Sequence, residues 1–288
     1  MIWHYLILGS AMVKTCHDFI LKKILKKEFS SEAFLNISLL TLPFFIFFIY
    51  DINFDIPTNI YLLIIIRSFF VVAGGILFNL ALKNSDLSVV APFYNLSPIF
   101  VIIVSSILLG ERLILIEYFG IALMILGSLL LKNEDVSIND HNKFVKSKYF
   151  AYVIVCLVLW AISATLTKPI VNVISSINAL FFSMLFSVIF LLLFQVIKHN
   201  NFLKIVKDLK KDWKIVSIAA VTNFIYSILY FMALSHPSAK VSIIIPLFRF
   251  YVFLEVLIGG EILKEKHFFK KLSASAIMLI GVIVMVLT

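Results

Sequence analysis

Ten long apolar runs limit the folds open to this chain more than any other feature of its sequence. A helix that crosses a bilayer needs about 20 mostly apolar residues, because each residue adds about 1.5 Å along an apolar core of roughly 30 Å. That core holds no water to satisfy the backbone, so each run is predicted to be a helix. The runs cover residues 2–21, 34–50, 59–82, 87–109, 114–131, 149–171, 177–197, 214–234, 239–259 and 270–287.

The composition also favours a membrane protein. The chain is 62% hydrophobic and only 14% charged, which leaves too little polar surface to cover a soluble domain of this length. The first run has no basic segment before it and no small-residue cleavage site, so it is predicted to be a transmembrane helix. We expect an all-α polytopic membrane protein in the lipid bilayer, in a bacterial inner (plasma) membrane.

The basic residues lie in short lysine clusters between the runs, which is typical of cytoplasmic loops near anionic headgroups. The net charge of +9 is therefore interpreted as a membrane feature, and no nucleic-acid partner is expected. The sequence has no Gly-rich nucleotide loop, no HExxH, no GxSxG and no Cys/His cluster. These absences argue against ATP-driven transport, an intramembrane protease and a metalloenzyme, and no cofactor or metal is expected.

Similar dipeptides recur in the same order in the two halves of the sequence. Gly110-Glu111 and Gly260-Glu261 are 150 positions apart, while Ala81-Leu82 and Ala233-Leu234 are 152 positions apart. This nearly constant offset indicates an internal repeat. Glu111 itself lies in a tight turn beside Arg112, and we expect it to cap a helix or form an interfacial ion pair.

The runs divide as five plus five around a polar linker at residues 132–148. This division predicts two five-helix repeats, at residues 1–131 and 149–288. Since five is an odd number, the two repeats cross the membrane in opposite directions. Inverted repeats of this kind are a common architecture of secondary transporters, whose site lies near the midplane between the halves.

The distribution of lysine and arginine predicts which connections face the cytoplasm. One alternate set of connections holds 19 of the 25 basic residues, and the other set holds Arg112, Lys168 and Lys240. This bias predicts that the Lys-rich connections are cytoplasmic and that both chain termini lie outside. The Lys-rich set comprises residues 22–33, 83–86, 132–148, 198–214 and 260–271.

One stretch of the first half carries a recognisable family pattern. Pro98 is followed by Gly110-Glu111 at a tight break and then by Gly120 and Gly127 in the next apolar run. With ten runs in two halves, this pattern resembles the EamA branch of the drug/metabolite transporter superfamily. The resemblance covers nearly the whole chain and is specific in the first half.

The second half departs from the family pattern at two positions. Phe248 stands where the pattern has proline, with Pro246 two residues earlier, and Lys270 stands where it has glycine. The resemblance implies a secondary carrier of small metabolites, often amino acids, that exports them by exchange or proton coupling. Related branches carry nucleotide sugars, sugar phosphates or lipid-linked sugars. The resemblance also implies cytoplasmic termini, which opposes the orientation predicted from charge.

Charged side chains inside apolar runs are the sharpest pointers to function, because each is costly in the membrane unless paired or hydrated. Ser10, Lys14, His17 and Asp18 share one face of the first run. Lys14 and Asp18 are predicted to pair, His17 titrates near neutral pH, and Asp18 is a candidate proton acceptor. Protons are therefore a candidate coupling ion. The alternative is a structural ion pair that lets a polar face pack inside the bundle.

The sixth run is the expected counterpart of the first. Lys168 lies 150 positions after Asp18, and Trp160 lies on the same run. Opposite charges at equivalent points of two inverted halves suit a zwitterionic substrate. The alternative is that Lys168, beside Pro169, extends to the lipid headgroups.

The ninth run contains Arg249 and Glu255. They are six residues apart, about 240° round a helix, so they do not both face one cavity directly. Arg249 follows Pro246 halfway along the run and is the candidate ligand for a carboxylate or phosphate, which a guanidinium binds with two donors. The alternative is an interhelical salt bridge from Arg249 to Asp18 or Glu255.

Polar and aromatic residues on other runs complete the candidate site, since such groups supply hydrogen bonds on the apolar wall of a cavity. They serve equally well as interhelical hydrogen bonds that hold a bundle together. The glycines at 74, 75, 120 and 127 are interpreted as close-packing positions. The candidate polar residues are Asn79, Tyr94, Asn95, Asn223, Tyr226 and Tyr230.

The leading hypothesis is an alternating-access carrier of a small-molecule substrate, with a cavity lined by the first, third, fourth, sixth, eighth and ninth runs. A carrier of lipid-linked sugars is an alternative within transport. A lipid-modifying enzyme or a structural partner is the alternative from another class, although an enzyme is expected to cluster its charges at one membrane face. The sequence leaves the substrate, the direction, the coupling ion and the oligomeric state open.

Overall fold

The computed structural model describes residues 2–25, 30–84, 93, 96–130, 144–199, 213–263 and 268–287. Within these ranges the chain forms helices and short connections but no strand, which confirms the all-α prediction. The first half contributes α1 (Ile2–Leu25), α2 (Ser30–Thr41), the 3₁₀ helix η1 (Leu42–Asp51), α3 (Thr58–Lys83), α5 (Ser97–Leu109) and α6 (Leu115–Leu130). The second half contributes α8 (Lys148–Val171), α9 (Ser176–His199), α11 (Trp213–Ser235), α12 (Val241–Phe248), α13 (Phe250–Leu263) and α14 (Phe268–Val286).

Among the described residues, four helices are long and apolar enough to cross a membrane, by length and composition. The apolar segments of α5, α6, α14 and the α2–η1 pair are shorter, while α1 carries several charges along its length. These helices support a multi-pass membrane protein, and the count of ten spans stays a prediction. The four long segments are Thr58–Ala81, Lys148–Val171, Ser176–Ile197 and Trp213–Ser235.

Two of the predicted runs are each divided between two helices at a proline. The chain changes from α2 to η1 just before Pro43, which lies in the first turn of η1. In the other run, Pro246 lies inside α12, and the helix ends two residues later. Proline has no backbone N–H to donate and its ring clashes with the preceding turn, which accounts for the end of α2 just before Pro43. The sequence predicts a kink at Pro43 within 34–50, and a break lies there, whereas the single helix expected over 239–259 is wrong.

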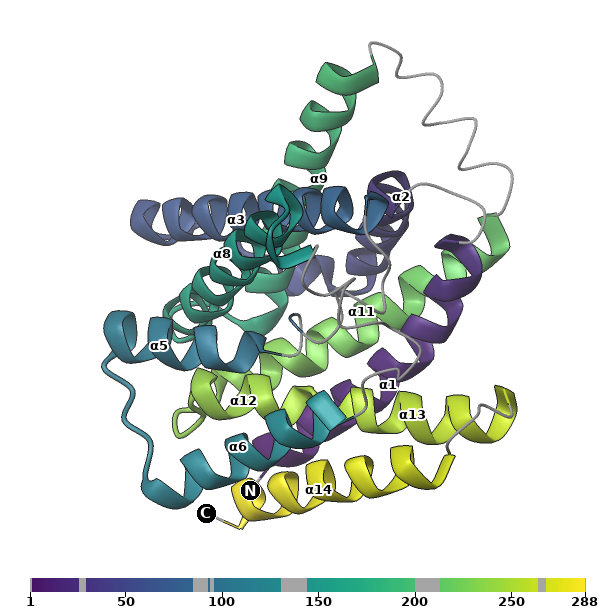
Figure 1. Ribbon diagram of the computed structural model, residues 1–288. Helices are drawn as coiled ribbons and strands as arrows, with labels where there is room; N and C mark the ends of the chain where they lie inside the picture. The colour runs from purple at the N-terminus through teal and green to yellow at the C-terminus, as the bar shows by residue number, and fades with distance from the viewer. Residues whose placement is uncertain are drawn as a thin grey trace.

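The helices of the two halves pack against each other in a reciprocal exchange of partners. α1 packs along α11 and α3 packs along α8, so the first helix of each half contacts the third span of the other. In the same way α5 packs against α8, while α12 and α13 pack against α1. The last helices, α6 and α14, pack against each other along the lower edge of Figure 1. This exchange fits an architecture of two repeats.

The α6–α14 contact depends on glycine. A Cβ on Gly127 would lie 2.5 Å from the Met278 side chain and 2.7 Å from the Ala274 carbonyl oxygen. On α3, a Cβ on Gly74 would lie 2.7 Å from Trp160, whereas one on Gly75 would meet nothing within 4 Å. Neighbouring residues on a helix point about 100° apart, so only one of this glycine pair can face α8. The close-packing interpretation is wrong for Gly75.

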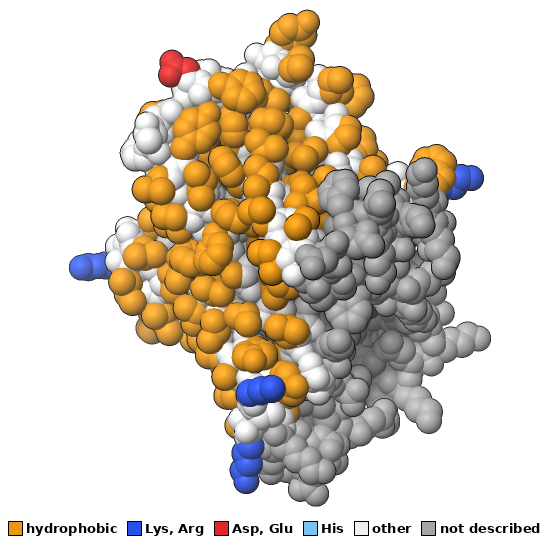
Figure 2. Space-filling view, turned by 90° about the horizontal axis from the view of Figure 1, so that it is seen from above, with side chains coloured by type: hydrophobic (Ala, Val, Ile, Leu, Met, Phe, Trp, Pro, Cys, Tyr) orange, Lys and Arg blue, Asp and Glu red, His pale blue; other side chains and the backbone are white. Residues whose placement is uncertain are grey.

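The outer surface of the bundle is apolar, as a lipid-facing surface must be. In Figure 2, the part of this face that the structure describes is covered almost continuously by hydrophobic side chains, with lysine or arginine only at its margins. Large side chains such as Phe47, Leu115 and Ile197 are each 79% exposed or more. A continuous patch of this extent on a soluble protein would drive association, whereas in a bilayer it contacts lipid.

Candidate functional site

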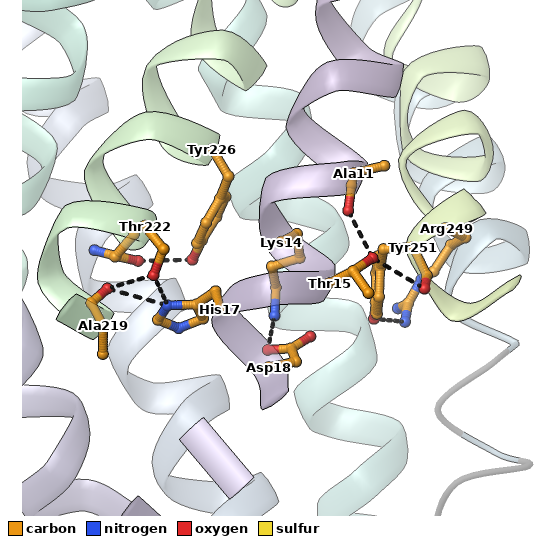
Figure 3. Close-up of polar contacts among 11 residues, drawn as sticks. Ala11, Lys14, Thr15, His17, Asp18, Ala219, Thr222, Tyr226, Arg249 and Tyr251 are labelled. Carbon is orange, nitrogen blue, oxygen red and sulfur yellow. Dashed lines mark hydrogen bonds and ion pairs between the residues drawn. The ribbon is translucent and has the colours of Figure 1, made fainter. Parts of the chain in front are cut away.

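The candidate site is organised around the charged residues in the middle of α1. Lys14 forms an ion pair with Asp18 one turn further along the helix. The Lys14 ammonium also lies 5.6 Å from the centre of the Tyr226 ring and 5.2 Å from that of Tyr251. These rings come from α11 and α13, so α1 presents its charges to the second half of the chain (Figure 3). Cation–π contacts stabilise an ammonium that has lost part of its water.

Arg249 joins the same group of side chains from the break between α12 and α13. Its Nη1 donates a hydrogen bond to the Tyr251 hydroxyl at 2.9 Å, and its Nη2 donates to the Ser97 hydroxyl at the start of α5. Lys14 and Arg249 thus approach the Tyr251 ring, at 5.2 and 5.9 Å from its centre. We call Lys14, Asp18, Tyr226, Arg249 and Tyr251 the Lys14 cluster.

By formal charge, the five residues of the Lys14 cluster include two cationic side chains, Lys14 and Arg249, and one carboxylate, Asp18. The cluster therefore has the electrostatic character to receive an anionic group, and Asp18 offers an acceptor for a cationic one. Ring contacts connect the cluster to Tyr230 through Phe248. The Phe248 ring centre lies 5.5 Å from that of Tyr251 and 5.4 Å from that of Tyr230.

His17 lies beside this cluster but turns towards α11. Its Nδ1 is 3.1 Å from the Ala219 carbonyl oxygen and 3.0 Å from the Thr222 hydroxyl. A carbonyl oxygen only accepts, so the contact with Ala219 requires a proton on Nδ1. Its ring centre is 5.3 Å from that of Tyr226. His17 is buried, and these bonds fix its ring in the α1–α11 contact.

Tyr226 and Asn223 form a chain of hydrogen bonds along α11. The Tyr226 hydroxyl donates to Asn223 Oδ1 at 2.7 Å, and Asn223 Nδ2 donates to the Thr41 hydroxyl at 3.3 Å. Because Thr41 ends α2, this chain links the cluster to the first half. The interhelical hydrogen bonds expected of such residues are therefore present.

Lys168 and Trp160 donate hydrogen bonds to residues outside the Lys14 cluster. Lys168 is buried and donates to the carbonyl oxygens of Leu234 at 2.8 Å and His236 at 2.7 Å, so it does not extend to the headgroups. These carbonyls end α11, where a cation is favoured by the helix dipole. Trp160 Nε1 donates to the Val71 carbonyl of α3 at 3.1 Å.

Glu111 caps the start of α12, which is one of the two roles that the sequence predicts for it. Gly110 ends α5 with a φ of 65°, a left-handed conformation that glycine adopts without strain. The Glu111 carboxylate then accepts from the backbone N–H of Val241 at 2.7 Å and of Ser242 at 2.9 Å, and from the Ser242 hydroxyl at 2.6 Å. The turn of the first half is thereby bound to the second half.

A salt bridge lies at the same end of the bundle. Lys240 Nζ is 3.0 Å from one Glu117 oxygen and donates at 3.0 Å to the Arg112 carbonyl. The other Glu117 oxygen accepts from the Ile114 N–H at 2.7 Å, at the start of α6. We call the connections 110–114 and 236–240, with these contacts, the Glu111 end.

For two other candidate residues, the structure gives the burial. Asn79 is half-buried on α3, and Glu255 is half-buried on α13. Tyr94 and Asn95 lie outside the described residues. Among the residues that the structure describes, no group of three His, Cys, Asp or Glu side chains is arranged to hold a metal ion.

Tyr251, Ser97 and Arg67 were missed by sequence reasoning as site residues. Tyr251 and Ser97 carry no charge, and only the fold shows that both contact Arg249. Arg67 had a signal, since it is an arginine inside the long apolar run of α3. Its Nε donates to the Thr167 hydroxyl of α8 at 3.0 Å.

Comparison with known proteins agrees with the fold. The sequence matches the model of the EamA-like transporter family over residues 1–132 and 147–287. No curated protein matches the sequence significantly. One crystal structure of a protein that is 14% identical superposes with a TM-score of 0.73, over 99% of this chain and 96% of the other. At that identity the likeness shows the fold alone.

Proposed function

The chain belongs to the EamA-like transporter family, and from this premise we propose that it is a secondary transporter of small polar metabolites. Its expected cargo is an amino acid or a related compound, exported by alternating access. Membership makes the protein a membrane transporter of the drug/metabolite type. The cargo, the direction and the energy source are our proposal.

The Lys14 cluster is the observation that supports an amino-acid-like substrate. A zwitterion presents a carboxylate and an ammonium a few ångströms apart. Arg249 offers a planar guanidinium to the carboxylate, and Asp18 offers a carboxylate to the ammonium. The rings of Tyr226 and Tyr251 already contact one ammonium, that of Lys14. A substrate ammonium makes the same cation–π contacts when it replaces that of Lys14.

Charge balance favours protons as the coupling ion. Lys14 and Asp18 neutralise each other in the structure described here. A proton on Asp18 removes the negative charge of the Lys14–Asp18 pair and makes the cluster more positive. Such a cluster binds an anionic group more strongly, so proton and substrate binding are coupled at one site.

Alternating access requires that the two halves separate at each end in turn. The halves proposed are residues 1–131 and 149–288, as inverted five-helix repeats joined by 132–148. The contacts of Glu111 and Lys240 cross between these halves and close the Glu111 end. Substrate passage at this end requires both contacts to break.

The orientation proposed from charge has the Lys-rich connections in the cytoplasm and the Glu111 end outside, in a bacterial inner membrane. A single cysteine in place of Ser238, with both native cysteines changed to serine, tests this orientation. We expect a membrane-impermeant maleimide to label it in intact cells. Labelling only after the cells are opened would place the Glu111 end in the cytoplasm.

Binding tests the substrate class before transport is attempted. The purified protein is screened against amino acids, sugar phosphates and nucleotide sugars for thermal stabilisation, which follows from selective binding to the folded state. We expect an amino acid to stabilise the wild type but neither Arg249→Ala nor Asp18→Asn. Arg112→Gln is the matched control, because its side chain is exposed at the Glu111 end. Stabilisation that survives in both cluster variants would refute the proposed site.

A further inference from the structure

Arg67 lies inside the bundle, apart from the Lys14 cluster. It belongs to the long apolar segment of α3, Thr58–Ala81. Its Nε donates to Thr167 of α8 at 3.0 Å, and its guanidinium lies 5.1 Å from the centre of the Phe231 ring of α11. Three helices from both halves of the chain therefore hold one guanidinium in place.

Within the described parts of the chain, no carboxylate pairs with Arg67. A guanidinium has five N–H donors, and Thr167 takes the one on Nε. The two terminal nitrogens make no hydrogen bond to any described residue, unlike those of Arg249, which donate to Tyr251 and Ser97. A charge without a counter-ion in a membrane interior is costly and marks a ligand or ion path.

A line of aromatic rings connects Arg67 to the Lys14 cluster. The Phe231 ring, which Arg67 contacts, has its centre 6.0 Å from that of the Tyr230 ring. The Tyr230 ring centre is 5.4 Å from that of Phe248, which is 5.5 Å from that of Tyr251. Tyr251 in turn contacts both Lys14 and Arg249. Arg67 and Arg249 thus lie at the two ends of one aromatic wall.

We infer that Arg67 is a second oxyanion-binding station on the transport path. Its terminal N–H groups form the fork that binds a carboxylate or a phosphate with two parallel hydrogen bonds. Thr167 and Phe231 are positioning residues that fix the plane of the fork. This inference rests on the proposed transport function and deepens it: the substrate carries an oxyanion, which passes between Arg67 and Arg249 along Tyr230 and Phe248.

The contacts of Thr167 fix the Arg67 guanidinium and leave its terminal nitrogens to a ligand. The hydroxyl of Thr167 accepts from Arg67 and donates to the Ser163 carbonyl oxygen at 2.9 Å within its own helix. It therefore orients Nε without occupying the terminal nitrogens. The Phe231 ring lies 5.1 Å from the guanidinium carbon and leaves the terminal nitrogens available for hydrogen bonds.

The small number of arginines makes this station directly testable. The chain has only Arg67, Arg112 and Arg249. In an Arg112→Lys background, the purified protein is treated with phenylglyoxal, which modifies arginine, and the modified peptides are quantified by mass spectrometry. We expect Arg67 to be modified, and we expect an oxyanion to slow that modification at least threefold. The probes are inorganic phosphate and acetate, with chloride at equal ionic strength as the control.

The two probes distinguish the two sources of an oxyanion. Protection by acetate alone assigns the station to carboxylates, and stronger protection by phosphate assigns it to phosphorylated substrates. Both outcomes support the station. It is refuted if Arg67 is not modified, or if chloride protects it as well as the other anions do.

Two variants give a second readout that does not depend on modification. Arg67→Gln removes the charge, while Arg67→Lys keeps it but loses the fork. Anion-dependent thermal stabilisation should fall at least tenfold in apparent affinity in Arg67→Gln and partly recover in Arg67→Lys, with unliganded stability close to wild type in the lysine variant. If wild-type protein transports no metabolite, the proposed function fails, but phenylglyoxal protection still tests Arg67. Unchanged anion affinity in Arg67→Gln would refute the station alone.

Discussion

Glu111→Gln should weaken the contact between the two halves at the Glu111 end. The wild-type carboxylate accepts three hydrogen bonds at the start of α12, from Val241 at 2.7 Å and from the N–H and hydroxyl of Ser242 at 2.9 and 2.6 Å. Glutamine has nearly the same shape, but it has one acceptor oxygen and no charge. The variant therefore loses part of a helix cap and the favourable interaction of an anion with the helix dipole.

The expected cost is about 2 kcal/mol. A lost N-terminal cap costs about 1 kcal/mol, and the loss of an anion at a helix N-terminus adds about 1 kcal/mol when the site is partly buried. Glu111 is only half-exposed, so screening by water does not erase either contribution. For a chain of this size, about 2 kcal/mol corresponds to a fall in Tm of about 4 °C.

Thermal unfolding in detergent, followed by size-exclusion chromatography, measures this cost. Arg112→Gln is the matched control, because it is adjacent in sequence and its exposed side chain should contribute less than about 0.5 kcal/mol. The same loss should open the Glu111 end roughly 30-fold more often, raising the maleimide labelling rate of a cysteine in place of the buried Ala239. Equal Tm and labelling rates in the two variants would refute the cap as a closure of this end.

Three further predictions concern packing and capping. Gly127→Ala places a Cβ 2.5 Å from Met278 and should cost about 1–3 kcal/mol, whereas Gly75→Ala meets nothing within 4 Å and should not destabilise the protein in the same unfolding assay. Lys168→Met removes two hydrogen bonds to buried carbonyls and should lower Tm by several degrees, a result that a headgroup-directed lysine would not give. Trp160→Phe removes one hydrogen bond and should cost about 1 kcal/mol; no change would mean that the Trp160 contact adds nothing to stability.

The helical segments were predictable because a bilayer admits few backbone solutions. Composition and run length located nearly every helix, and Pro43 marked one of the breaks in advance. Pro246 carried the same signal, yet the run around it was expected to be one helix.

The candidate site was predictable only in part. In-span charges identified Lys14, Asp18 and Arg249, which the fold brings to Tyr251. The same reasoning could not separate Lys168, because a cation that caps a helix and one that lines a cavity look alike in sequence. Tyr251 could not be predicted as a site residue, since its role arises from a break in the helix that brings it beside Arg249.

Glycine shows a similar limit. Gly74 and Gly75 are neighbours in sequence, but only a Cβ on Gly74 would collide with Trp160. Which of two adjacent residues faces a neighbouring helix depends on helix rotation, and a mostly apolar run has too few polar residues to show that rotation.

Counterflow in proteoliposomes tests the central claim most directly. Vesicles loaded with the amino acid that stabilises the protein are diluted into a trace of the labelled compound, with no ATP present. We predict transient accumulation of label with wild-type protein and with Arg112→Gln, and none with Arg249→Ala or Asp18→Asn, although these variants remain monodisperse. Accumulation at the wild-type level in both cluster variants would contradict the account, as would its absence with wild-type protein for every compound that binds.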